Sequence, residues 1–318
     1  MPTPTSPSSP PKPDKPSPAL AFAALGRGGF SAAELAPLSD LSKADAARLA
    51  SLWPTLEAPV RIKAIKDVTG LAERHVEYLF GRVFRIALAD SSAVVRHLGI
   101  AGLWEDDGED LVDRFLQIAR DDASSDVRAE ALRGLGRFAT SAALGDLGVD
   151  HAERLRVALL EIASDASFED LARRRALESL AVFGSGPETA AMILAAYESD
   201  DNADRTSAVA AMGRSEDRRW LPQVLAELES PDSELRVEAA RASAALGDAE
   251  AVPVLSTLLD DHDGDVRRAA IVALGRIGGA EALRALRSLD APEGGGDHGL
   301  IEEALDEAST SAELFGGA

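Results

Sequence analysis

Apolar residues recur along most of this chain in blocks of about 31 to 35 residues, and residues 248–279 show the block most clearly. In this block an acidic turn at residues 260–265 separates two apolar stripes at helical spacing. The first stripe consists of Val252, Leu255, Leu258 and Leu259, and the second of Val266, Ala270, Ala273 and Leu274. Each stripe predicts an amphipathic helix. Because one hairpin cannot bury both stripes by itself, the block predicts a stack of similar hairpins.

The repeats can be aligned on one arginine near the start of each predicted second helix. The spacings between these anchor arginines are 35, 32, 45, 32, 31 and 31 residues. We expect residues 139–150 to absorb the long interval as a loop or an extra helical turn. A degenerate eighth unit has His298 where arginine is expected, as suits a polar cap. The anchor arginines are Arg61, Arg96, Arg128, Arg173, Arg205, Arg236 and Arg267.

These features predict an all-α fold, a right-handed α-solenoid of about seven helical hairpins with a degenerate C-terminal cap. The solenoid should span residues 42–308, after a helical lead-in segment at residues 19–41. Residues 1–18 are rich in proline and serine and have almost nothing to bury, which predicts a disordered tail. Residues 309–318 should form a flexible C-terminus.

Three of the repeated segments carry a resemblance to a known family. They read DGDVRRAAIVALGRIG at residues 263–278, SDVRAEALRGLG at residues 125–136 and SELRVEAARASAALG at residues 233–247. This pattern resembles the HEAT-repeat family, in particular the bacterial HEAT-like repeats of the phycobilin-lyase type. The resemblance implies that the second helices line a concave face and that Asp–Arg pairs form a ladder along the stack.

On a helical wheel each anchor arginine falls inside the apolar arc of its helix. A charge in that position must be paired or must reach a turn. Carboxylates two residues before an anchor arginine are the partners that we expect from an adjacent repeat, namely Asp126, Glu234 and Asp265. We therefore interpret the anchor arginines as structural.

The exposed strip of the predicted second helices carries more basic than acidic residues. Its carboxylates are only Glu105, Glu130, Glu178 and Glu238. We predict a binding groove of positive potential here; the alternative is that the arginines only pair with neighbouring glutamates on solvated helices. The basic residues of the strip are Lys63, Lys66, Arg133, Arg137, Arg174, Arg175, Arg214, Arg241, Arg268 and Arg276.

The overall composition excludes several classes of protein. The formal net charge is −21, from 33 basic and 54 acidic residues, which disfavours nucleic acid and anionic membranes as partners. The absence of cysteine excludes disulfides, thiolate metal sites and a cysteine nucleophile. No run of 18 apolar residues occurs, so we predict a cytoplasmic protein that does not contact membranes.

The sequence contains no recognisable catalytic or metal-binding motif. Asp261, Asp263 and Asp265 imitate the opening of a calcium loop, but valines stand where that loop needs glycine and a bidentate glutamate. Helix capping explains these aspartates better. No histidine has another histidine three or four residues away, and neither GxSxG nor a Walker A motif occurs. We therefore predict no catalytic residue, no metal and no cofactor.

The leading functional hypothesis is a non-enzymatic protein-binding or scaffold protein. It would hold a segment of a partner protein, for instance an acidic one, on the concave face, where Leu98, Val182 and Val272 would add apolar contacts. The alternatives are a bilin lyase-like or isomerase-like activity, as in repeat relatives, and nucleic-acid binding along the basic strip. We also expect the Trp220 indole to be partly exposed at the start of a first helix.

Overall fold

The computed structural model describes residues 17–289 and 297–315, with side-chain surroundings up to residue 310. All regular structure within these ranges is helical. The chain divides after Asp107 into two compact units. Apart from residues 17 and 18, the stretch predicted to be a disordered tail lies outside the described residues.

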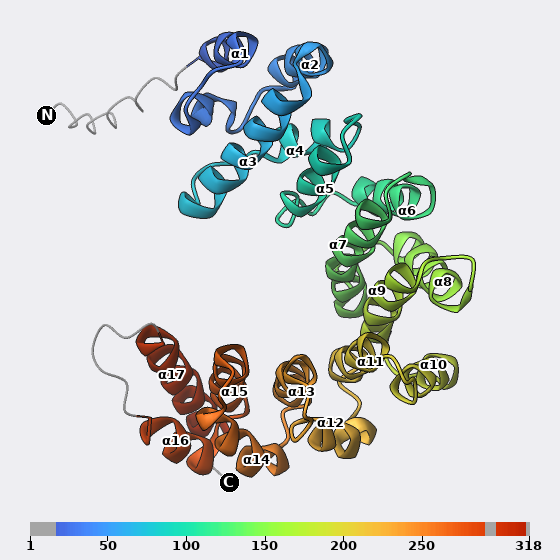
Figure 1. The fold of residues 1–318 in the computed structure, drawn as a ribbon, viewed down its shortest axis with the longest axis vertical. Helices are drawn as coiled ribbons and strands as arrows, with labels where there is room; N and C mark the ends of the chain where they lie inside the picture. Colours follow the sequence, from blue (N-terminus) through green and yellow to red (C-terminus); the bar gives the residue numbers. More distant parts are fainter. Residues whose placement is uncertain (1–16, 290–296, 316–318) are drawn as a thin grey trace, which may run out of the picture. The chain divides into compact units, whose positions relative to one another are not determined.

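The first unit begins with α1, which packs against η1, and ends with α5, which packs against α3 and α4 (Figure 1). The cap of α2 is Ser42, whose hydroxyl accepts a hydrogen bond from the Asp45 amide at 3.0 Å, as the capping-box spacing suggests. The elements are α1 (Pro18–Arg27), η1 (Ala32–Leu38), α2 (Lys43–Leu52), η2 (Trp53–Thr55), α3 (Ala58–Arg74), α4 (Gly81–Ala87) and α5 (Ala93–Ala101).

The second unit is a stack of helical hairpins. Its α-helices are α6 (Asp110–Asp121), α7 (Ser125–Leu144), α8 (Val149–Ser164), α9 (Asp170–Leu180), α10 (Pro187–Tyr197), α11 (Asn202–Arg214), α12 (Leu221–Glu227), α13 (Ser233–Leu246), α14 (Val252–Thr257), α15 (Gly264–Ile277), α16 (Gly279–Arg287) and α17 (His298–Phe315). Short 3-10 segments, η3 (Ala181–Phe183), η4 (Arg218–Trp220), η5 (Ala249–Ala251) and η6 (Leu258–Asp260), adjoin them.

Within this unit each odd-numbered helix packs on the next odd-numbered helix, from α7 through α17. Figure 1 shows these helices on one side of the stack and the even-numbered helices on the other. We call the surface formed by α7, α9, α11, α13, α15 and α17 the second-helix face. The arrangement confirms the predicted all-α fold of stacked hairpins, with α16 and α17 in the place of the degenerate cap.

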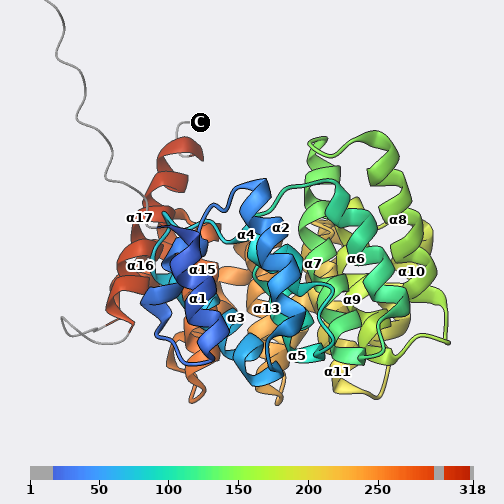
Figure 2. The same cartoon turned by 90° about the horizontal axis from the view of Figure 1, so that it is seen from above.

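Two features near the ends of helices refine the predicted boundaries. The long interval between repeats is taken up by helix, because α7 has 20 residues and α8 has 16. Figure 2 shows the turn between them projecting beyond the ends of α6 and α9. At the C-terminus α17 continues to Phe315, past residue 308, where we expected flexible chain. After Gly299 in its first turn, α17 contains no further glycine and no proline, so nothing in its sequence ends the helix at residue 308.

The expectation that Trp220 is partly exposed is wrong. The side chain is buried, with 5% of the residue exposed, and its indole Nε1 donates a hydrogen bond to Ser185 Oγ at 3.0 Å. A buried indole usually finds such a partner. Ser185 precedes α10 in the preceding hairpin, so the local sequence around Trp220 contains no sign of this contact.

Candidate functional site

The anchor arginine of α13, Arg236, is buried and connects two consecutive turns. Its Nε and Nη2 donate to the two carboxylate oxygens of Asp261 at 2.8 and 3.1 Å, and its Nη1 donates to the Ser230 carbonyl at 2.8 Å. Both charged side chains are only 8% exposed. Ser230 precedes α13 and Asp261 precedes α15, so one guanidinium holds neighbouring hairpins together.

The first unit repeats this arrangement, because Arg61 donates to both carboxylate oxygens of Asp90 at 2.7 and 3.1 Å. Asp90 and Asp261 each lie six residues before the anchor arginine of the following repeat. Those arginines, Arg96 and Arg267, donate in turn to the backbone carbonyls of Asp90 and Asp261 at 2.8 and 2.7 Å. The carboxylate of each aspartate therefore pairs with the anchor arginine of the preceding repeat, and the backbone carbonyl of the same aspartate accepts from the anchor arginine of its own repeat.

These contacts correct the partners that we assigned from the sequence. Among the described residues, Asp126, Glu234 and Asp265 form no ion pair with an anchor arginine, and Asp265 pairs instead with Arg268. Position −2 lies in the first turn of the second helix, whereas position −6 lies in the preceding turn, which an arginine of the previous repeat can reach. A signal was present in the sequence, because aspartate occurs six residues before Arg96, Arg128 and Arg267.

The remaining anchor arginines have less uniform partners. Arg128 forms an ion pair with Glu169, which precedes α9, and Arg205 with Glu227 of α12 at 2.6 Å. Arg173 pairs within its own helix, and its Nε is buried without a hydrogen-bond partner in the described structure. Buried bidentate pairing is thus a property of particular repeats and not of all of them.

The buried pair predicts acid sensitivity. Burial alone would raise the pKa of Asp261, but hydrogen bonds from Arg236 and the Asp263 amide outweigh it and hold the pKa below its ordinary value of 3.8. Stability from this group is therefore complete above about pH 4 and is lost as the pH falls through the lowered pKa. Asp261→Asn cannot titrate, so its melting temperature should fall less between about pH 5 and pH 3 than that of the unmodified protein. Equal falls would contradict this assignment.

Four arginines of the predicted basic strip form ion pairs with a carboxylate one turn away on the same helix. Arg133, for example, donates through Nε to Glu130 at 2.8 Å, and these hydrogen bonds raise the pKa of Arg133. Pairing with neighbouring carboxylates, the alternative that the sequence left open, thus describes these positions, although Glu130 and Glu178 are buried and not solvated. The pairs are Glu130–Arg133, Arg175–Glu178, Glu238–Arg241 and Asp265–Arg268.

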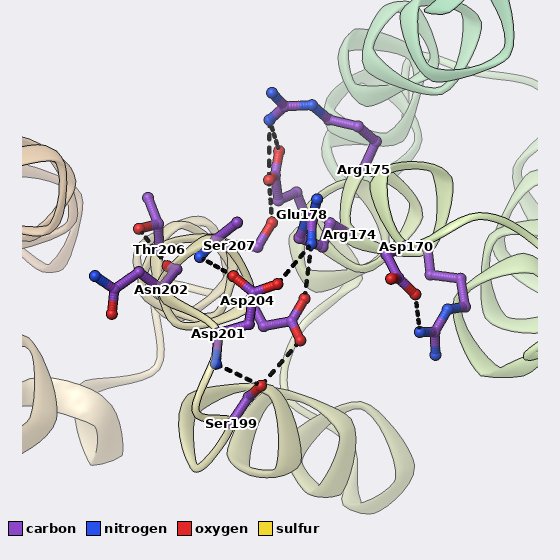
Figure 3. Close-up of polar contacts among 12 residues, drawn as sticks. Asp170, Arg174, Arg175, Glu178, Ser199, Asp201, Asn202, Asp204, Thr206 and Ser207 are labelled. Atoms are coloured by element: carbon purple, nitrogen blue, oxygen red, sulfur yellow. Dashed lines mark hydrogen bonds and ion pairs between the residues drawn. The ribbon is translucent and has the colours of Figure 1, made fainter. Parts of the chain in front are cut away.

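The adjacent arginines of α9 point to different partners, as Figure 3 shows. Arg175 donates to both carboxylate oxygens of Glu178 at 2.8 and 3.0 Å, and buried Glu178 also accepts a hydrogen bond from Ser207 of α11. Arg174 donates to Asp204 of α11 at 2.9 Å, and its side chain is 20% exposed. Arg174 therefore connects two hairpins and is not the exposed groove cation that the wheel indicated.

The other basic residues of the strip differ in their exposure and in the contacts that they form. Arg214 and Arg276 are exposed, and no carboxylate among the described residues pairs with either. In the first unit Lys66 is likewise exposed and pairs with no carboxylate among the described residues, whereas Lys63 pairs with a carboxylate one turn along its helix. The guanidinium of Arg137 lies 4.2 Å from the centroid of the adjacent phenylalanine ring.

Two adjoining cavities open on the second-helix face. The larger, about 610 Å³, is lined from α9 through the start of α15, and the smaller, about 290 Å³, from α13 through α17. Arg241 and Asp265 line both. In the larger cavity three arginines face five carboxylates, so the excess of basic residues that we predicted for the groove does not hold there. These residues are Arg175, Arg214 and Arg241, and Glu178, Glu234, Glu238, Asp263 and Asp265.

The wheel overlooked Glu234, Asp263 and Asp265 because they belong to the N-terminal turns of α13 and α15, outside the strip positions. Asp263 caps α15 by accepting a hydrogen bond from the Asp265 amide at 2.8 Å, and this bond is the main reason that its pKa is lowered. The capping interpretation is therefore confirmed for Asp263, whereas Asp261 pairs with Arg236 and Asp265 pairs with Arg268. In the described parts of the chain no three His, Asp or Glu side chains are grouped to hold a metal ion.

No helix within the described ranges is both long enough and apolar enough to cross a membrane. Residues 221–305, from α12 into α17, match the family model of HEAT repeats. No curated protein matches the chain.

Several solved structures are similar at low identity. The Escherichia coli protein YibA is 18% identical, with a TM-score of 0.41, over 85% of this chain and 98% of that one. Human deoxyhypusine hydroxylase, an enzyme by its name, is 17% identical, with a TM-score of 0.36, over 85% and 96%. A chain from a Kap95p–RanGDP structure is 14% identical, with a TM-score of 0.45, over 88% and 45%. Likeness at this level identifies neither an activity nor a partner.

Proposed function

Because this chain carries HEAT repeats, we propose that it is a non-enzymatic protein-binding scaffold that holds a segment of a partner protein on the second-helix face of its second unit. The observation that carries the proposal is the pair of adjoining cavities, which follow the stack from α9 to α17. A surface hollowed along several consecutive repeats suits an extended or helical segment better than a compact small molecule.

The lining of these cavities has the composition of an interaction surface. Partly buried Val237 and Val272 lie among arginines and carboxylates, so a bound segment would bury apolar area inside a polar rim. Of the apolar residues that we expected to contribute, Val272 lines the smaller cavity, whereas Leu98 and Val182 line neither of the two. The net charge of −21 disfavours nucleic acid as the partner, and a chain without cysteine suits a reducing cytoplasm.

The proposal is tested by replacing apolar residues that line the two cavities with charged ones. The protein is immobilised, and partners from a lysate of the source cells are compared between the unmodified chain and the double variant Val237→Glu/Val272→Glu. We expect the double variant to lose at least about tenfold of the captured partner, because two buried apolar contacts become buried charges.

The matched control is Val157→Glu, which places the same charge on a half-exposed valine of α8, a first helix. This variant should keep the partner. Circular dichroism should show equal helix content for all three proteins. If Val237→Glu/Val272→Glu keeps the partner while Val157→Glu loses it, the binding surface is on the first helices and the proposal is wrong.

A further inference from the structure

Consecutive second helices present the same order of residues along the cavities. On α13 the order from the N-terminal end is Glu234, Val237, Arg241, and these positions share one helical face. On α15 acidic, apolar and basic side chains again follow one another on one face, ending with Arg276. On α11 the row ends with Arg214.

Four charged lining residues, Arg175, Glu178, Glu238 and Arg268, form ion pairs with one another or with a neighbouring lining residue. Most of the remaining lining falls into three parallel parts. The basic edge consists of Arg214, Arg241 and Arg276. The acidic edge consists of Glu234, Asp263 and Asp265. The apolar floor between them consists of Ala210, Val237, Ala244, Ala269, Val272 and Leu300.

Both edges have charge that is available to a partner. Neither Arg214 nor Arg276 is paired with a carboxylate in the described part of the chain, and the Arg241 side chain is 66% exposed at 3.2 Å from Glu238. On the other edge Glu234 is exposed and forms no ion pair with any described residue, and the Asp265 side chain, which pairs with Arg268, is still 75% exposed. Helix dipoles favour acids at N-termini and bases at C-termini. Helix dipoles do not, however, explain why the acidic and the basic side chains of this stack face the same cavities across an apolar floor.

The two edges are far enough apart to admit a helix between them. Glu234 and Arg241 are seven residues apart, about 10 Å along a helix, and Asp265 and Arg276 are eleven apart, about 16 Å. An α-helix with its side chains is about 10–12 Å across. Because neighbouring helices pack about 8–10 Å apart, the row from α11 to α17 is about 27 Å long. A helix of about 18 residues has that length.

We propose that the partner segment is an amphipathic α-helix that crosses α11, α13, α15 and α17 with carboxylates on one flank and lysines or arginines on the other. This inference rests on the proposed function and specifies the partner's chemistry. The carboxylate flank lies along the basic edge, the cationic flank lies along the acidic edge, and the apolar stripe covers the floor. When the apolar stripe of the bound helix lies on the floor, reversing the helix exchanges the edges that its two flanks contact. The two oppositely charged edges therefore also determine whether the helix runs from α11 to α17 or from α17 to α11.

The test uses four synthetic 18-residue peptides with the same apolar stripe, matched for helicity by circular dichroism. Two mixed peptides carry Glu on one flank and Lys on the other, and differ in which of the two flanks carries Glu. The two same-sign peptides carry Glu on both flanks or Lys on both flanks. Each peptide has a photo-crosslinker at its N-terminus. We expect both mixed peptides to bind about tenfold more tightly than either same-sign peptide by fluorescence anisotropy at low salt. Exchanging the flanks should move the cross-link from the α11 end of the row to the α17 end, or the reverse.

Charge reversal on the protein gives the second arm. The variant Arg214→Glu/Arg241→Glu/Arg276→Glu should bind the mixed peptides about tenfold less tightly and should prefer the Lys and Lys peptide. The control Arg154→Glu/Arg156→Glu/Arg284→Glu reverses three exposed arginines on α8 and α16 and should leave all four affinities unchanged.

The outcomes separate this inference from the proposed function. If all four peptides bind alike, or if both mixed peptides cross-link at the same end, the two-edge inference is wrong. If in that case Val237→Glu/Val272→Glu still abolishes binding, the second-helix face remains the binding surface and only the partner's chemistry was misassigned. If that floor variant binds every peptide as well as the unmodified protein, both proposals fail.

Discussion

Replacing Arg236 with methionine should lower the free energy of unfolding of the second unit by about 3–5 kcal/mol. The substitution keeps most of the apolar volume of the side chain but leaves the carboxylate of Asp261, which is only 8% exposed, without its bidentate partner. It also leaves the Ser230 carbonyl without the hydrogen bond from Nη1. An uncompensated buried charge is among the costliest single defects in a protein.

The change is measured by urea denaturation and by hydrogen exchange of amides in α13 and α15. The matched control is Arg173→Met, at the same repeat position, because Arg173 pairs with Asp170, whose side chain is 70% exposed. An exposed carboxylate can return to water, so the control should lose less than about 1 kcal/mol. Similar losses for the two variants would mean that the buried pair contributes no more than a surface pair.

Substituting Gly213 with alanine should destabilise the second unit by about 1–3 kcal/mol, although alanine is the better helix former. A Cβ at Gly213, in the last turn of α11, would lie 2.7 Å from the Cα and 2.8 Å from the Cβ of Ala242 on α13. The nearest atom belongs to the backbone and cannot rotate away, so α11 and α13 must separate. The melting temperature of the full chain provides the measurement.

Gly299→Ala is the matched control, since a Cβ there, in the first turn of α17, meets no atom within 4 Å. This substitution should be neutral or should raise stability by up to about 1 kcal/mol, because alanine restricts the unfolded chain and favours the helix. The two glycine substitutions should thus have opposite signs. A Gly213→Ala protein as stable as the Gly299→Ala protein would show that the packing of α11 on α13 adjusts without cost.

Much of the fold was predictable because its signals are local. Helical spacing of apolar residues and the acidic turns between them indicate each hairpin, and the recurring arginine indicates how often the hairpin repeats. The same wheel indicated that the anchor arginines face apolar surroundings, and Arg61 and Arg236 are buried. Capping is equally local, as Ser42 and Asp263 demonstrate.

The candidate site was harder to predict, because its residues come together only through the packing of different repeats. The wheel treated each second helix as isolated and assigned charge by angle alone. Arg174 appeared exposed on that wheel, but Asp204 of the next hairpin neutralises it. Glu234 and Asp265 appeared to be partners of buried arginines, but their carboxylates line a cavity formed by several helices.

The sequence by itself determined that this chain is a row of helical hairpins with a buried arginine in several of them, because helical periodicity and burial of an apolar stripe depend on neighbours a few residues away. Only the tertiary structure decided which carboxylate meets which arginine and which charges face one cavity. Asp261 reaches Arg236 across 25 residues, and Trp220 reaches Ser185 across 35. Such contacts depend on how one hairpin is set against the next, and the spacing of residues within a single helix does not contain that information.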